Sequence, residues 1–419
     1  MELVCPSLPH GQTKLKVMNP SLRNLPRKPI AGFMAALLLS CTGSVNQPQA
    51  KVPASTPEAT FVPAAPAPEK SDSKIQVALL LDTSGSMSGL INQAKAKLWK
   101  IVNELATARQ DGAIPQLEIA LYEYGKSTLP QKEGYLQQLV PLTSNLDKVS
   151  EELFALTTNG GDEFCGLTIH EATKNLEWSD SNNDLKLIFI AGNEGFHQGP
   201  FNYQTACSDA ISKGIIVNTI FCGNNQEGVN TYWKAGADLA DGQFLTIDHN
   251  QQIVEVETPY DTTMVRLNSE LNGTYVVYGA SGYQYYAGNI AQDGNALSMN
   301  RNVAAERAVS KSLNNYNGEW DLVTAMQADS TAMDQLKDKE LPEEMQTMNT
   351  EERQEFLAEK ENKRKAIQSE ILELNQKRNA FLKTAQQSGG QSLDDALLSA
   401  IRVQANAKNF VFVNETPNP

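Results

Sequence analysis

The sequence predicts an α/β protein, with a doubly wound, mostly parallel six-stranded sheet followed by an α-helical C-terminal region that contains a long helical hairpin. Two observations predict this fold class. Apolar runs of strand length alternate with amphipathic helical segments, which is the βαβ rhythm of a parallel sheet. Beyond about residue 257 the pattern changes to helix and loop, without another apolar strand pair. At 419 residues the chain is long enough for both parts.

The predicted strands are the apolar runs of the first half of the chain. The first run, KIQVALLLD, has the composition of a strand that is buried on both faces. The second and third strands are expected to form a hairpin, which gives the sheet an antiparallel edge. The predicted strands are residues 75–82, 117–124, 135–140, 185–191, 215–222 and 243–247. The predicted helices among them are residues 87–108, 145–156, 166–177, 203–213 and 229–240.

The C-terminal region is predicted to be helical at 291–314, 319–328 and 350–386. The last of these segments lacks Gly and Pro, so it predicts one helix of about 50 Å at the usual rise per residue. We expect it to pair with the final helix, 393–407, as an antiparallel hairpin. Four of its apolar residues have the spacing of a coiled-coil seam that Arg378 interrupts, and dimerisation through this seam is the alternative. The seam residues are Ile367, Ile371, Leu374 and Phe381.

Charge and motif content exclude several classes of function. The chain has 35 basic and 49 acidic residues, and its net charge of −14 argues against nucleic-acid binding. It contains no glycine-rich phosphate-binding motif, so nucleotide chemistry is not expected. No Ser/His/Asp or Cys/His signature of a nucleophile with its base is visible, so we do not expect an enzyme.

Residues 1–40 have the pattern of an export signal that starts at Met1 or, at a more usual length, at Met18. Basic residues precede the apolar core AGFMAALLL, which is too short to span a bilayer as a mature helix. The signal ends in the letters LLSC at Cys41. Residues 41–73 are rich in Pro, Ala and Ser and are expected to form an extended tether rather than a core.

The most informative residues for function follow the first predicted strand. Asp82, Ser84 and Ser86 have the spacing DxSxS and lie where ligands bind in open α/β sheets, at the carboxyl end of a strand. Hard divalent cations such as Mg²⁺ prefer oxygen ligands. One carboxylate and two hydroxyls leave coordination positions open, and a carboxylate of a partner protein could complete them. In the alternative interpretation, Asp82 is a turn or helix-cap residue and the serines belong to a polar loop.

This DxSxS, set between a strand and an amphipathic helix, resembles the metal-ion-dependent adhesion site of the von Willebrand factor type A domain family. The likeness covers roughly residues 74–250 and implies a bound divalent cation, Mg²⁺ or else Ca²⁺ or Mn²⁺. The family supplies a threonine and an aspartate from two further loops, but here these loops read TNGGDEFCG and IAGNEG. We expect Asp162 or Glu163 to bind the ion directly, and Asn193 or Glu194 to bind it through water. The alternative is a degenerate site that holds no metal.

The segments GGDEFCG, FIAGNEGFHQGP and LDDALLSAIRVQA, with the lipobox-like LLSC, resemble a group of bacterial envelope lipoproteins with such variant sites. The resemblance implies that Cys41 is lipidated and that the protein is anchored in the cell envelope, facing the periplasm or the cell surface. The alternative is an ordinary cleaved signal with an incidental cysteine. Its partner would be an unknown envelope or extracellular protein, with no nucleic acid or nucleotide. The expected divisions are signal 1–40, tether 41–73, A domain 74–250 and helical region 251–419. A metal-independent scaffold of an envelope complex is the alternative function.

Three cysteines remain for the mature domains: Cys165, Cys207 and Cys222. Outside the cytoplasm a disulfide is plausible chemistry, and we expect one between Cys207 and Cys222, because both are placed at the site end of the predicted sheet. A thiol nucleophile and three buried apolar thiols are the alternatives. No cysteine spacing matches a zinc site.

Overall fold

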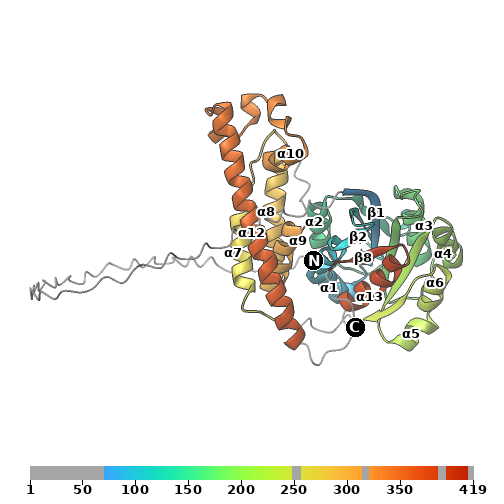
Figure 1. The fold of residues 1–419 in the computed structure, drawn as a ribbon. Helices are drawn as coiled ribbons and strands as arrows, with labels where there is room; N and C mark the ends of the chain where they lie inside the picture. The colour runs from blue at the N-terminus through green and yellow to red at the C-terminus, as the bar shows by residue number, and fades with distance from the viewer. Residues whose placement is uncertain (1–69, 248–255, 314–319, 386–392, 414–419) are drawn as a thin grey trace, which may run out of the picture. The chain divides into compact units, whose positions relative to one another are not determined.

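The computed structural model describes residues 70–247, 256–313, 320–385 and 393–413 (Figure 1). Residues 1–69, which carry the predicted export signal, Cys41 and most of the tether, lie outside the described residues. All described elements belong to one unit, Ala65–Pro419, that is defined by its internal contacts. Within the described ranges, no helix is both long and apolar enough to cross a membrane.

A six-stranded sheet with the strand order β4-β3-β1-β5-β6-β7 forms the first part of the molecule. Every strand pairing in it is parallel except the β3–β4 hairpin, which confirms the predicted fold class and its antiparallel edge. β1 lies at the centre, between β3 and β5. The strands are β1 Lys70–Asp82, β3 Ile114–Tyr124, β4 Leu136–Thr143, β5 Leu185–Gly192, β6 Ile215–Cys222 and β7 Phe244–Ile247.

Helices cover both faces of this sheet, as Figure 1 shows, because successive side chains of its buried strands point to opposite sides. Along β1, for example, Leu80 packs in one hydrophobic core and Leu81 in the other. One face carries α1 Ser88–Ala106, α2 Leu146–Ala155 and α13 Leu393–Asn406. The other carries α3 Cys165–Asn175, α4 Tyr203–Ser212 and α6 Trp233–Leu239, with α5 Asn225–Asn230 before α6.

The helical region follows the sheet with two helices where the sequence predicted one. The predicted helix 291–314 is instead α8 Gly282–Met299 and α9 Arg301–Leu313, separated by the extended residue Asn300. The remaining helices of this region are α7 Asp261–Asn272, α10 Leu322–Ala328, α11 Glu343–Gln346 and α12 Thr350–Ala385. α12 agrees with the uninterrupted helix predicted from residue 350.

The predicted hairpin of the last two helices is wrong, because α12 packs against α7, α9 and α10 whereas α13 packs against α1 and the sheet. Leu397 and Ile401 of α13 enter the core beside α1. The amides of Asn218 on β6 and Gln404 on α13 are both buried and hydrogen-bond each other in both directions, at 3.0 and 2.7 Å. The chain then adds a strand the sequence did not predict, β8 Phe410–Phe412, which pairs with β2 Ala108–Gln110.

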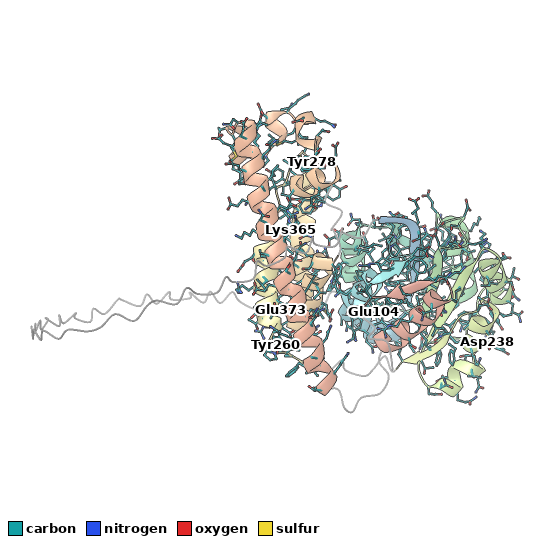
Figure 2. The ribbon with its side chains drawn as sticks, in the orientation of Figure 1. Glu104, Asp238, Tyr260, Tyr278, Lys365 and Glu373 are labelled. Carbon is teal, nitrogen blue, oxygen red and sulfur yellow. The ribbon has the colours of Figure 1, made fainter. Side chains whose placement is uncertain are left out.

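The apolar seam predicted on α12 is used inside the chain. Ile367 and Ile371 pack against residues of α7 and α9, so this seam is not free for the dimer that the sequence suggested as an alternative. Arg378, which interrupts the seam, is fully buried and donates to Asp261 at 2.9 Å and to Glu306 at 2.7 Å. Exposed charges such as Lys365 and Glu373 lie along the same helix (Figure 2).

Buried polar contacts join the helical region to the sheet part. Asn103 of α1 donates to the carboxylate of Glu306 on α9 at 2.8 Å. The guanidinium of Arg307 lies between Asp147 of α2, at 2.6 Å, and Asp293 of α8, at 3.0 Å. It also stacks over the ring of Trp99 at 4.3 Å. The helical region is therefore anchored to α1 and α2 by groups that are costly to separate once buried.

Candidate functional site

Asp82 ends the central strand β1 and is fully buried. Its Oδ1 accepts a hydrogen bond from the backbone N–H of Ser84 at 2.7 Å. Its Oδ2 is also buried and has no hydrogen-bond partner within the described part of the chain. Since buried polar atoms are nearly always paired, this oxygen is free to accept a water molecule or a cation from outside the described residues.

The two serines follow on a short 3-10 turn, Gly85–Met87. Ser84 occupies the cap position of this turn but makes no side-chain capping bond, so its hydroxyl is not used to hold the turn. The hydroxyl oxygens of Ser84 and Ser86 lie 3.4 Å apart. Ser84 is buried beside Asp82, whereas Ser86 is exposed. The DxSxS motif therefore presents its oxygens from the buried strand end outward to solvent.

The loop before α3 is held against the ends of β1 and β3. The N–H of Asn159 donates to the carbonyl of Thr83 at 3.1 Å, and the N–H of Ser127 donates to that of Gly160 at 2.6 Å. These bonds place the side chain of Glu163 next to Asp82, on either side of Gly125. Both side chains lie 2.8 Å from where a Cβ of Gly125 would be, and Gly125 has a φ of +80°, so only glycine fits there.

At the end of β5, Gly192 stands where the family resemblance implies an aspartate, and its neighbours leave no space for a side chain. A Cβ on Gly192 would lie 2.6 Å from the hydroxyl of Tyr124 and 3.0 Å from Oδ2 of Asp82. The Tyr124 hydroxyl donates to the carbonyl of Ala191 at 2.9 Å. This bond holds the tyrosine, which lies on β3, against the space that a side chain at position 192 would need. Beyond it, the side-chain oxygen of Asn193 is buried without a hydrogen-bond partner among the described residues. Glu194 is exposed at the rim.

The structure thus brings together Asp82, Ser84, Ser86 and Glu163, with Asp162, Asn193 and Glu194 around them. Sequence reasoning missed Tyr124 and Gly125, which shape the space between the two buried carboxyl groups. Their signal was present, because they directly end the second predicted strand, LEIALYEY, at the same edge of the sheet.

Both buried carboxyl groups hold their protons unusually firmly. Burial raises the pKa of Asp82 to about 7; hydrogen bonding from Ser84 opposes this only in part. Burial raises the pKa of Glu163 to about 8, and the negative charges of Asp82, Glu194 and Asp162 raise it further. The pair therefore exchanges protons near neutral pH, and a cation placed between the two groups would compete with those protons.

These donors fit a hard divalent cation such as Mg²⁺. Within the described ranges, no cluster of three or more His, Cys, Asp or Glu side chains forms a ready metal site. A cation here would instead be held by Asp82, the two serine hydroxyls and water, with Glu163 as the nearest second carboxylate. Hydroxyl, carboxylate and water oxygens are the ligands that Mg²⁺ accepts, and the unpaired Oδ2 of Asp82 would be one of them.

The predicted disulfide between Cys207 and Cys222 is wrong for this structure, in which both are buried free thiols. Cys207 on α4 packs in the core on one face of the sheet, and Cys222 on β6 packs in the core on the other face. The sheet separates the two sulfur atoms, so they cannot bond without rebuilding the fold. Cys165 is likewise a buried free thiol, 3.7 Å from the hydroxyl of Tyr124.

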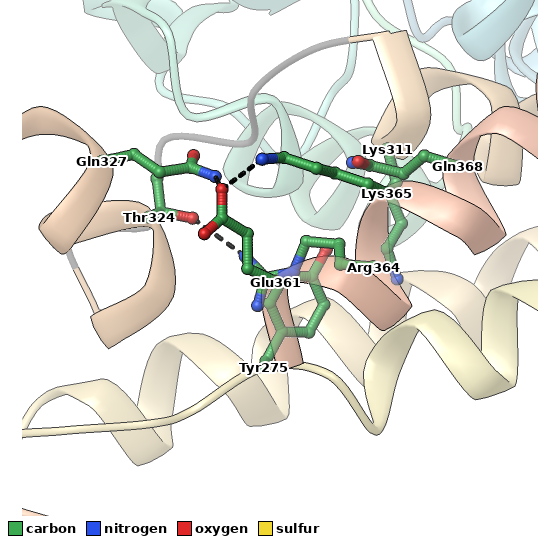
Figure 3. Close-up of a pocket in the computed structure, with 8 residues that line it drawn as sticks. All are labelled: Tyr275, Lys311, Thr324, Gln327, Glu361, Arg364, Lys365 and Gln368. Atoms are coloured by element: carbon green, nitrogen blue, oxygen red, sulfur yellow. Dashed lines mark hydrogen bonds and ion pairs between the residues drawn. The ribbon is translucent and has the colours of Figure 1, made fainter. Parts of the chain in front are cut away.

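A polar cavity of about 100 Å³ lies in the helical region, between α10 and α12 (Figure 3). Its buried cations are Arg364 and Lys311, but both are already committed to structural bonds. Arg364 donates to Asp321 at 2.6 and 3.1 Å and also bonds to Thr274 and Thr324. Lys311 donates to Asp293 at 3.0 Å and to two asparagine side chains. This cavity is therefore a weaker candidate for binding an anion than its charges suggest.

Comparison with known proteins gives likenesses to solved structures only. No protein-family model and no curated protein matches the chain. BatB, a conserved hypothetical protein from Bacteroides thetaiotaomicron, is 15% identical over 42% of this chain and 90% of that one, with a TM-score of 0.33. The SpRpn10 VWA domain is 14% identical over 43% and 91%, with a TM-score of 0.33. Proximal thread matrix protein 1 of the mussel byssus, solved with a zinc-occupied MIDAS motif, is 16% identical over 41% and 49%, with a TM-score of 0.26.

Proposed function

We propose that this chain is a protein-binding module whose contact with its partner depends on a divalent cation held at Asp82. One observation supports it most: among the described residues, a fully buried carboxylate has an oxygen without a hydrogen-bond partner, pairs with no Lys or Arg, and has two hydroxyls beside it. Mg²⁺, Ca²⁺ or Mn²⁺ would supply the missing positive charge. Ser86 is exposed at the rim, which leaves a coordination position of the ion open to a carboxylate of the partner.

The proposed setting is the bacterial cell envelope. Cys41, in its lipobox-like LLSC, would carry the lipid, and residues 42–73 would tether the module to the membrane. The partner in this proposal is an envelope or extracellular protein. Labelling with a clickable fatty-acid analogue, compared between the full chain and Cys41→Ser, tests the anchor independently of the metal site.

The proposed role is not catalytic. Burial raises the pKa of the Cys165 thiol far above its usual range, so this sulfur is a poor nucleophile. His170 stacks on Phe201 at 4.0 Å between ring centroids, and His197 packs against Tyr232 at 5.1 Å. Within the described ranges, neither imidazole hydrogen-bonds to a nucleophilic side chain, as general-base catalysis would require.

A metal-independent scaffold is the second candidate, and one observation favours it. Asp82 has no exposed surface, so an ion can reach it only if the surrounding loops move. In that case the domain would serve as a rigid platform, fixed to the helical region through Arg307 and Glu306.

Crystals of residues 74–419 soaked in Mn²⁺ separate the two candidates. The metal-binding proposal predicts anomalous density between Asp82, Ser86 and Glu163, which disappears in Asp82→Ala. Soaked crystals with only water at this position, and with the side chains unmoved, would support the scaffold instead. Asp238→Ala, which removes an exposed carboxylate on α6, is the matched control and should leave the density unchanged.

A further inference from the structure

A second surface lies beside the candidate site, where the loop after β5 meets the turn between α5 and α6. Two hydrogen bonds join these segments. The N–H of Phe196 donates to the carbonyl of Thr231 at 2.9 Å, and the indole N–H of Trp233 donates to the carbonyl of Glu194 at 2.7 Å. Since Trp233 is fully buried, the loop that carries Glu194 is fixed to a rigid element. Side chains on this loop are thereby held in place before any partner arrives.

Tyr232 occupies an unfavourable backbone conformation within this turn. Its φ of +73° and ψ of 9° lie in the left-handed region, which bulky side chains rarely adopt and which glycine or asparagine tolerates better. Its side chain is nevertheless large and 46% exposed. Backbone strain of this kind is concentrated at functional sites, so an exposed tyrosine in this conformation marks a surface to examine for binding.

The ring of Tyr232 forms part of an aromatic corner. It meets the imidazole of His197 edge to face, with 5.1 Å between the ring centroids, and lies 6.1 Å from the ring of Tyr203. His197 is also exposed, whereas Tyr203 is buried beneath. About half of the Tyr232 side chain thus remains open to solvent, while the rings of His197 and Tyr203 lie against the rest.

The charge next to this corner is negative and uncompensated. Glu194 is exposed, and its carboxylate has one hydrogen-bond contact in the described ranges, with the amide of Gln198 at 3.4 Å. No Lys or Arg among the described residues pairs with Glu194 or with the neighbouring Asp162. The negative charge of Glu194 also acts on the candidate metal site, because it helps to raise the pKa of Asp82 and of Glu163. An exposed tyrosine ring and an unpaired carboxylate, carried on two segments that are hydrogen-bonded to each other, are together complementary to a cationic side chain.

We propose that Glu194, His197 and Tyr232 form a recognition patch for an arginine side chain of the partner protein. This inference rests on the proposed function, because it specifies the partner of the same module. A guanidinium can stack flat on the tyrosine ring while its N–H groups donate to the carboxylate, which an ammonium group does less well. An acidic side chain would be repelled by Glu194, and an apolar one would leave that carboxylate unused.

Short peptides provide a direct test, with residues 74–419 in EDTA so that no metal contributes. The probe is Ac-Gly-Arg-Gly-NH₂, with the Lys and Glu analogues for comparison, followed through the ¹³Cε1 resonance of His197 in histidine-labelled protein. The proposal predicts a saturable shift with the Arg peptide, weaker binding of the Lys peptide and no shift with the Glu peptide. An equal response to the Arg and Glu peptides, or no response, would overturn it.

Variants separate recognition from structure. Glu194→Gln and Tyr232→Asn should each weaken Arg-peptide binding by about threefold or more, as expected for one lost charge or cation–π contact. Tyr232→Asn should leave the melting temperature unchanged or raise it, since asparagine tolerates the left-handed conformation. Tyr283→Ala, which removes an exposed tyrosine on α8, is the matched control and should bind normally. A structural role for Tyr232 would instead lower stability and leave peptide binding intact.

The same assay distinguishes this inference from the proposed function. Asp82→Ala removes the carboxylate at the centre of the metal site and should still bind the Arg peptide. Conversely, Tyr232→Asn should still bind Mn²⁺. Peptide binding that is lost in Asp82→Ala would contradict a separate recognition patch, whereas failure of Mn²⁺ binding would contradict only the metal-dependent function.

Discussion

Among the regions of this molecule that bury carboxylates, two do so in opposite ways. In the helical region, burial opposes the ionisation of Asp293, but Lys311 and Arg307 outweigh it, and the pKa of this group lies below its ordinary value. At the end of β1, burial raises the pKa of Asp82 to about 7, and the charges that act on it are negative. The first region supplies its own cations and is complete. In the second, no Lys or Arg among the described residues pairs with Asp82, and on this basis we propose a binding role for it rather than a structural one.

The largest expected effect comes from breaking the compensated region. Asp293→Ala leaves Arg307 and Lys311 buried without their shared partner, and we expect it to lower the free energy of unfolding by about 3–5 kcal/mol. Urea denaturation measures this. Asp238→Ala removes one partner of the exposed pair with Lys234 and should change stability very little. Equal costs for the two variants would mean that Asp293 is not a buried anchor.

The uncompensated region should show itself in the pH dependence of stability. Asp82 has a raised pKa in the folded state, so the folded protein binds more protons than the unfolded chain between about pH 4 and pH 7. In EDTA, the free energy of unfolding should therefore fall as pH rises through this window, by on the order of 2–4 kcal/mol from Asp82. Asp293 has a lowered pKa, so its contribution to the free energy of unfolding rises with pH, and it does so below this window.

The urea midpoint measured at intervals from pH 4 to pH 8 tests this slope. Asp82→Asn, which keeps the shape but not the charge, should flatten the profile. A midpoint that rises steadily across the window in the unaltered protein would show that Asp82 is already compensated, and the contrast between the two regions would then fail.

A smaller effect is expected from the glycine that lies against the uncompensated carboxyl group. Gly192→Ala places a Cβ within 2.6 Å of the Tyr124 hydroxyl and should lower the free energy of unfolding by about 1–3 kcal/mol. The penalty should shrink when the hydroxyl is removed in a Tyr124→Phe background. Gly160→Ala, in the same site but with nothing within 4 Å of the added Cβ, should cost much less. Equal losses in both variants would show that the clash does not control the site.

Much of the fold could be predicted from the sequence because strands such as LKLIFIA and IIVNTIFC are long apolar runs that only a sheet covered on both faces can bury. The sequence could not show against which elements α12 and α13 pack. α13 has an apolar face that fits any apolar surface, and its partners on α1 lie nearly three hundred residues earlier, as the pair Glu104–Arg402 shows. Arg378 breaks the seam of α12 in the sequence, but Asp261 and Glu306, far away in the chain, neutralise it.

The candidate site also has a part that could be predicted from the sequence and a part that could not. The DxSxS motif could be predicted directly, because its residues follow the end of a predicted strand in the sequence. That Glu163 rather than Asp162 turns inward could not, since it depends on Gly125 leaving space on a neighbouring strand. The face of the sheet on which Cys222 lies could have been predicted from the alternation of side chains along β6. Ile220 and Cys222, two residues apart, share one core, while Phe221 lies in the other.

Titration calorimetry of Mn²⁺ at pH 7, repeated in buffers with different ionisation enthalpies, tests the central claim most directly. If an external cation completes the site, Mn²⁺ must displace protons from Asp82 and Glu163, whose pKa values lie at about 7 and about 8. We predict saturable binding that releases protons, with both the binding and the release lost in Asp82→Asn. Binding that releases no protons, or that survives this substitution, would contradict the account.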